Sequence, residues 1–406
     1  MFFRCVLFSI LIACSACSNQ AILTSAINTF AIDDAFQGYF NDDIFAANNP
    51  IAVAVPSVMF NLPDSIKQQL DKQVAHLPTR LERLVALRHW VYNEIADYEY
   101  DVGTTVPISE LEKVNRINCY SFSMLFKVAA DYVDVPAEIH FIDTSPRWDM
   151  QKKTWVYLQH ISVVSEIHGF YSSEQLETIA GIPALLNIDY KAATSRKLVF
   201  LTDINPALSD TAAKTRALTK EQVAARFYIN KAAEALLADD LSTAYTYSKY
   251  AIAVDQHSAE AWNNLGVIYT KKNALSAARM AYQRSFDLDD TLLTNLNNLY
   301  ATYIRMGEGD AAMGFIAEHK SIWKKNPYFY YNLGETSAAI GDYQQAIQHY
   351  LAAISLKSDE PLFYQALSTA SLQLRSDKAS RSEDIANGGS MPEEAIASSS
   401  AMLSKI

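Results

Sequence analysis

The chain has 406 residues, half of them hydrophobic, which is enough for two or three domains with cores of their own. Its formal net charge of −11 argues against nucleic-acid binding. Four cysteines occur, at positions 5, 14, 17 and 119, so the body of the chain beyond its leader contains a single thiol.

The first 14 residues are typical of a secretory signal. Arg4 precedes an apolar run from Cys5 to Ala13, which is shorter than the ~20 residues that span a bilayer. Residues 11–14 (Leu-Ile-Ala-Cys) resemble a bacterial lipobox, which implies lipidation of Cys14; Cys17 is the alternative lipid site, and an ordinary cleaved signal is the other interpretation.

The lipobox resemblance implies a protein held to a membrane by lipid rather than spanning it. Ser15, in place of Asp, follows the lipid site and favours the outer membrane of a bacterial envelope. In such an oxidising compartment paired cysteines form disulfides, and Cys119 has only Cys17 as a potential partner, so a free thiol is expected. Residues 15–74 form an N-terminal segment without a strong pattern.

Residues 75–215 predict an α+β domain. Apolar spacing predicts a helix over 79–96 with Thr79 as its N-cap, then a polar loop, then a second helix that begins close to Cys119. Segments 137–142, 155–164 and 198–204 are rich in β-branched and aromatic residues and predict strands. Helices followed by strands indicate an α+β fold.

Cys119 has two interpretations. The helix dipole and the unpaired N–H groups at a helix N-terminus favour a thiolate, which makes Cys119 a candidate nucleophile. A buried structural cysteine is the alternative.

The Asn-Cys-x-Ser-Phe segment at 118–122, with a histidine in a later strand and an aspartate closing another, resembles the transglutaminase-like fold of papain-type enzymes. The resemblance implies a catalytic Cys119, His160 and Asp203. The cysteine would attack an acyl carbon, the histidine would move the proton, and the aspartate would orient the histidine. His140 and His168 compete with His160, and Asp189 is the alternative third residue, since the stretch between Val164 and Leu198 is long.

The second half of the chain repeats every 34 residues. Bulky residues recur at 228, 262, 296, 330 and 364, and alanines recur at 244, 278, 312 and 346. This pattern resembles the tetratricopeptide repeat, best in 262–290 and 330–358, and implies an all-α solenoid over 220–375.

The resemblance to tetratricopeptide repeats implies a concave surface for a protein or peptide, with a rigid spacer or a lid on the neighbouring domain as the alternative. Four asparagines are candidates for the peptide-binding groove: Asn263, Asn264, Asn298 and Asn332. Residues 376–406 are polar and small, which predicts a disordered tail.

Taken together, the sequence predicts a membrane-anchored thiol acyl-transfer enzyme, more a peptidase or amidase than a crosslinking transglutaminase, with repeats that bind protein or peptide. The alternative is a catalytically inactive envelope scaffold whose repeats recruit partner proteins. No cofactor or metal is expected, because the sequence has neither zinc-ligand spacing nor a glycine-rich phosphate loop.

Overall fold

The computed structural model describes residues 34–45, 53, 56–143, 148–151, 154–157, 160–169, 196–204, 214–290, 292–319 and 323–386. The chain divides into two compact units, Met1–Ile268 and Tyr269–Ile406. The predicted lipid sites Cys14 and Cys17 and the alternative Asp189 lie outside the described residues.

Several helices, two of them with a side-chain N-cap, precede the sheet. In chain order they are α2 (Pro56–Met59), α3 (Asp64–Leu70), η3 (Asp71–Ala75), α4 (Arg80–Glu94), η4 (Ile108–Glu110), α5 (Leu111–Val114) and α6 (Cys119–Tyr132). Thr79 caps α4 in a reciprocal box with Glu82, and the Asn118 side chain caps α6 by accepting from the Ser121 N–H at 2.9 Å. Helix α6 is buried along much of its length, which fixes the position of its first residue, Cys119.

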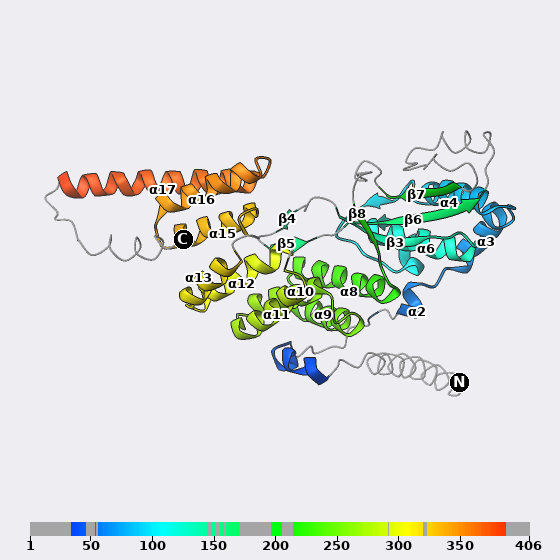
Figure 1. Ribbon diagram of the computed structural model, residues 1–406, viewed down its shortest axis with the longest axis horizontal. Coiled ribbons are helices and arrows are strands. Elements are labelled where there is room, and N and C mark those ends of the chain that lie inside the picture. Colours follow the sequence, from blue (N-terminus) through cyan, green and yellow to red (C-terminus); the bar gives the residue numbers. More distant parts are fainter. Residues whose placement is uncertain are drawn as a thin grey trace, which may run out of the picture. The chain divides into compact units, whose positions relative to one another are not determined.

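A four-stranded antiparallel sheet follows, in the order β7-β6-β3-β8 (Figure 1). Its strands are β3 (Glu138–Asp143), β6 (Ile161–Gly169), β7 (Arg196–Thr202) and β8 (Lys214–Ala217). Helix α6 contacts β3 and β6, and α4 contacts α6. A parallel pair, β1 (Glu99–Tyr100) with β2 (Arg116–Ile117), leads directly into Asn118 and Cys119.

The segment 155–164, predicted as one strand, is two. β5 (Thr154–Tyr157) pairs with β4 (Trp148–Gln151) in a separate hairpin, whereas β6 begins at Ile161, opposite Phe141 of β3. His160 therefore lies just before a strand and not inside one. β-branched and aromatic residues run through both strands, so composition does not reveal where the chain changes its pairing partner.

The remaining helices of the first unit are α8 (Lys220–Leu237), α9 (Leu241–Val254) and most of α10 (Ala259–Lys271). Two short 3-10 helices, η1 (Asp34–Tyr39) and η2 (Asp42–Phe45), belong to the same unit. The Phe45 ring stacks on Tyr245 of α9 at 4.1 Å between centroids, and Asp42 accepts from the Tyr245 hydroxyl at 2.8 Å. Part of the segment predicted as 15–74 thus packs against the first pair of repeat helices.

After α10, the second unit consists of paired helices. Figure 1 draws this unit in colours from green to red. They are α11 (Leu275–Leu288), α12 (Leu293–Arg305), α13 (Gly309–Glu318), α15 (Pro327–Ala339), α16 (Tyr343–Leu356) and α17 (Pro361–Ala386). Within the α15–α16 pair, a Cβ added at Gly334 would lie 2.3 Å from the Tyr350 ring, so the close approach of the two helices requires glycine.

Helix α17 corrects the predicted tail. It runs to Ala386, so residues 376–386 are helical instead of disordered, and 387–406 lie outside the described residues. The sequence from 376 to 387 has no Gly or Pro, so no strong helix breaker interrupts it. The prediction of disorder rested on polar composition, which does not exclude a helix.

None of the described helices combines the length and apolarity that a membrane crossing requires.

Candidate functional site

The single thiol of the described chain lies at the N-terminus of a buried helix. Cys119 is the first residue of α6 and is half-buried, and its thiol is free. Both of its chain neighbours are deeply buried, Asn118 at 3% and Tyr120 at 2% exposure, so the backbone that carries the thiol has little freedom.

The sheet brings His160 and Asp203 to one place. β6 and β7 are antiparallel, with Val163 opposite Thr202, so the start of β6 lies beside the end of β7. His160 immediately precedes β6 and Asp203 immediately follows β7. Nε2 of His160 is hydrogen-bonded to Oδ2 of Asp203, a carboxylate only 2% exposed.

The Cys119 thiol completes the group. Burial acts to lower the pKa of His160, but hydrogen bonds to Asp203 and to Cys119, with the charges of both, raise it to about 9. The three residues predicted from the sequence, Cys119, His160 and Asp203, therefore lie together, in the order thiol, imidazole, carboxylate.

Ser162 is a fourth member of this group that the sequence did not reveal. Its hydroxyl donates to Oδ2 of Asp203 and lies 3.4 Å from Nε2 of His160, and the residue is fully buried. It follows His160 by two residues, the spacing that places side chains on one face of a strand. The strand predicted over 155–164 already placed positions 160 and 162 on one face, so this spacing was the available signal.

Side chains of helix α4 hydrogen-bond to the end of β7 and to the backbone of Asp203, which follows it. Arg88 donates to the Leu201 carbonyl at 3.1 Å and to the Thr202 hydroxyl at 2.5 Å, and the Tyr92 hydroxyl donates to the Asp203 carbonyl at 2.7 Å. Arg88 is only 2% exposed. An arginine and a tyrosine four residues apart in an otherwise apolar helix face were the sequence signal for this contact.

The competing histidines lie elsewhere. His140 of β3 is bonded through Nδ1 to Thr215 at 3.1 Å and through Nε2 to Glu138 at 3.4 Å. His168 follows His160 by eight residues, about 26 Å along β6, and lines a pocket of about 750 Å³.

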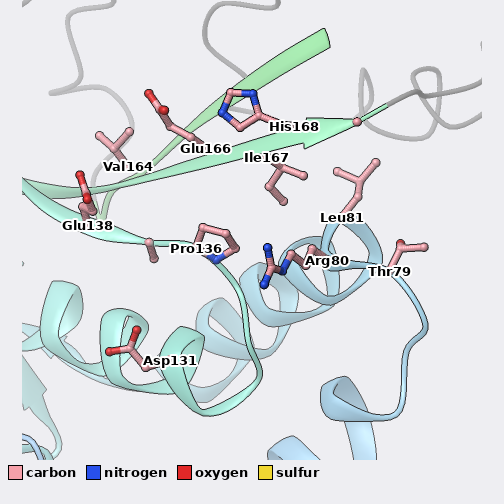
Figure 2. A pocket seen from close by; sticks show the side chains of 12 residues that line it. Thr79, Arg80, Leu81, Asp131, Pro136, Glu138, Val164, Glu166, Ile167 and His168 are labelled. Carbon is pink, nitrogen blue, oxygen red and sulfur yellow. The ribbon is translucent and has the colours of Figure 1, made fainter. Parts of the chain in front are cut away.

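That pocket is separate from Cys119. Its walls come from the start of α4, the end of α6 near Asp131, the start of β3 and the end of β6 (Figure 2). Cys119 and Asp131 are at opposite ends of α6, so this pocket is remote from the thiol. Within the described residues, no group of three or more His, Cys, Asp or Glu side chains is arranged to hold a metal ion.

The four asparagines predicted for the groove differ in exposure. Asn264, Asn298 and Asn332 are spaced by 34 and are half-buried, whereas Asn263 is only 3% exposed. Asn263 is one position earlier on its helix, a rotation of about 100° that turns it inward. Its equivalent one repeat later, Asn297, is also buried and accepts from the Asn326 amide at 3.1 Å. Asn263 is therefore corrected to an interior position.

Comparison with known proteins identifies the repeats. A family model of the tetratricopeptide repeat matches residues 259–291 and 327–360. The second half of the chain thus carries tetratricopeptide repeats, a fold that supports protein–protein interaction. No curated protein matches the chain.

Solved structures resemble only part of the chain. The Cut9–Hcn1 hetero-tetramer of the APC/C is 18% identical, with a TM-score of 0.34, and the match covers 38% of this chain and 31% of that one. PilF of Pseudomonas aeruginosa is also 18% identical, with a TM-score of 0.34 and coverage of 43% and 80%. A tetratricopeptide-repeat protein of Thermus thermophilus is 14% identical, with a TM-score of 0.33 and coverage of 38% and 91%.

Proposed function

We propose that the chain is a thiol acyl-transfer enzyme with a transglutaminase-like domain over residues 75–215, whose repeats hold a protein or peptide substrate. The observation that carries the proposal is that His160 interacts with the Cys119 thiol and is hydrogen-bonded to the buried Asp203. A cysteine with an imidazole and an orienting carboxylate is the arrangement that activates a thiol for attack on an acyl carbon.

The reaction proceeds in two steps. The Cys119 sulfur attacks the carbonyl carbon of an amide, the C–N bond breaks, and His160 donates a proton to the leaving amine. The acyl group is then bound to sulfur as a thioester. Water or an amine attacks this thioester after giving its proton to His160, and the thiolate leaves. We favour water as the acceptor, which makes the enzyme a peptidase or amidase, over the amine that a crosslinking transglutaminase uses.

Alkylation of the native protein tests the nucleophile. An imidazolium beside a sulfur favours the thiolate, so iodoacetamide should label Cys119 well below pH 8, and His160→Ala should slow that labelling. His140→Ala and His168→Ala are matched controls that leave the rate unchanged, since neither lies at the thiol. Peptide mapping assigns the label to Cys119. Equal, slow labelling of wild type and His160→Ala would instead support the catalytically inactive scaffold whose repeats recruit partners.

A second assay separates the two acceptors. A glutamine-containing protein is incubated with the enzyme and a primary-amine probe, with Cys119→Ser as the control. Incorporation of the probe would show transfer, whereas release of ammonia or peptide fragments without incorporation would show hydrolysis.

We propose further that a lipid on Cys14 holds the protein to the bacterial envelope, with the outer membrane favoured. The support is the lipobox-like run at 11–14. Labelled fatty acid should enter the wild-type protein and Cys17→Ser but not Cys14→Ser; the reverse pattern would assign the lipid to Cys17.

A further inference from the structure

Both chain neighbours of Cys119 are bonded to other parts of the first unit. The Asn118 amide donates to the Thr105 hydroxyl at 2.7 Å, while its carbonyl oxygen caps α6. On the other side, the Tyr120 hydroxyl donates to the Val223 carbonyl of α8 at 2.9 Å. The Tyr120 ring also lies 6.1 Å from that of Phe227.

Glu234, near the end of the same helix, holds the Thr105 side of this arrangement. Its Oε1 accepts from the Thr105 N–H at 2.6 Å, and its Oε2 accepts from Lys231 at 2.6 Å. Thr105 is only 1% exposed, so its N–H has little access to water if the carboxylate is removed. Burial raises the pKa of Glu234.

Helix α8 thus contacts, directly or through Thr105, the residues on both sides of Cys119. Val223 and Glu234 are 11 residues apart, which is about 16 Å along a helix. One end contacts the residue after Cys119, and the other contacts, through Thr105, the residue before it. The boundary between the two compact units falls after α8, at Ile268, which places this first repeat helix with the thiol.

We propose that Glu234 is a positioning residue for Cys119, acting through Thr105 and the Asn118 cap, so that the first helix of the repeat array is also part of the thiol site. The inference deepens the proposed function and rests on it for its catalytic meaning. The contacts themselves are independent of whether the thiol turns over a substrate.

The test compares variants of the full chain. Glu234→Ala removes the acceptor, whereas Glu234→Gln keeps a carbonyl oxygen for the Thr105 N–H. Tyr120→Phe removes the second contact with little change in volume. The matched control is Tyr245→Phe, which loses a hydroxyl contact on α9 that leads to Asp42 and not to the thiol.

Two readouts are measured: the pH profile of Cys119 alkylation, and amide hydrogen exchange of residues 118–124. Glu234→Ala should slow low-pH alkylation roughly tenfold or more, the scale of effect that a small misplacement of a reacting group produces, and should speed exchange at the start of α6. Glu234→Gln should stay within about twofold of wild type in both readouts, as should the control.

The outcomes distinguish this inference from the proposed function. If wild type labels at low pH and Glu234→Ala matches it, the positioning role is overturned while the thiol chemistry stands. If wild type labels no faster than His160→Ala, the proposed function fails, and hydrogen exchange of residues 118–124 decides the positioning role. Faster exchange in Glu234→Ala but not in Glu234→Gln supports that role. Unchanged exchange in Glu234→Ala overturns it. Should Glu234→Ala not fold, Thr105→Val takes its place, because it removes the hydroxyl that accepts from the Asn118 amide. Slower labelling or faster exchange than in Tyr245→Phe then supports the positioning role, and a match to Tyr245→Phe in both readouts overturns it. Tyr120→Phe tests in the same way the contact of α8 on the other side of the thiol.

Discussion

At the residue scale, the candidate site depends on one imidazole that interacts with both the Asp203 carboxylate and the Cys119 thiol. Asp203 is bonded to Nε2 and is itself held by Ser162 and, through its carbonyl, by Tyr92. These contacts hold the carboxylate that in turn orients the imidazole ring. The carboxylate and the serine are both buried, which keeps water from competing for the same oxygens.

The raised pKa of His160 has a consequence for stability. The ordinary value is 6.5 and the folded value is about 9, so the folded protein binds a proton more tightly than the unfolded chain. The resulting stabilisation is complete below pH 6.5 and is lost as the pH rises through about 9.

Asp203→Asn should remove the main interaction that raises this pKa. We expect wild type to exceed the variant in stability by about 1–3 kcal/mol near pH 6, and the difference to shrink towards pH 9. Urea unfolding midpoints at the two pH values measure it. The control places Asp203→Asn in a His160→Gln background, where the difference should not vary with pH. A stability difference between wild type and Asp203→Asn that grows with pH would mean that the aspartate does not stabilise an imidazolium.

The core of the candidate site was predictable, and its supports were not. Cys119 could be singled out because it is the lone thiol at a helix start, and the family resemblance supplied His160 and Asp203. Arg88, Tyr92 and Ser162 were missed because each contact joins residues more than 40 positions apart in the chain. Long-range contacts of this kind follow from the register of β6 and β7, which the sequence pattern leaves open.

At the element scale, the repeats show where periodicity is informative and where it is incomplete. The 34-residue phase predicted the helix pairs, and the two best copies coincide with the matched repeats. A further periodic feature went unnoticed: residues with positive φ recur every 34 positions, at Asp239, Asn273, Gly307 and Gly341. All lie where the first helix of a pair ends, and Asp, Asn and Gly are the residues that tolerate this conformation. A search for αL-tolerant residues in phase with the bulky positions would have found them.

At the scale of the whole molecule, the boundary between compact units does not follow the boundary between fold types. The first unit includes the sheet, the thiol site and the first helix pair, while the second begins within α10. In a repeat array each repeat contacts only the neighbouring repeats, so the effect of a destabilising substitution is expected to remain local. The contacts described around Cys119 are all made by residues of the first unit.

Gly334→Ala tests this separation. The added Cβ would lie 2.3 Å from the Tyr350 ring, which is only 1% exposed. Overpacking of this kind costs about 1–3 kcal/mol, more than the ~0.5–1 kcal/mol that alanine gains over glycine in a helix. We expect faster hydrogen exchange in α15 and α16, and an unchanged pH profile of Cys119 alkylation. Gly314→Ala in α13 is the matched control: no atom lies within 4 Å of its added Cβ, so exchange in α13 should slow or stay the same. If the pH profile of Cys119 alkylation shifts in Gly334→Ala but not in Gly314→Ala, a substitution in the second unit affects the thiol site. The local account of the array would then have to be replaced by one in which strain passes through α10.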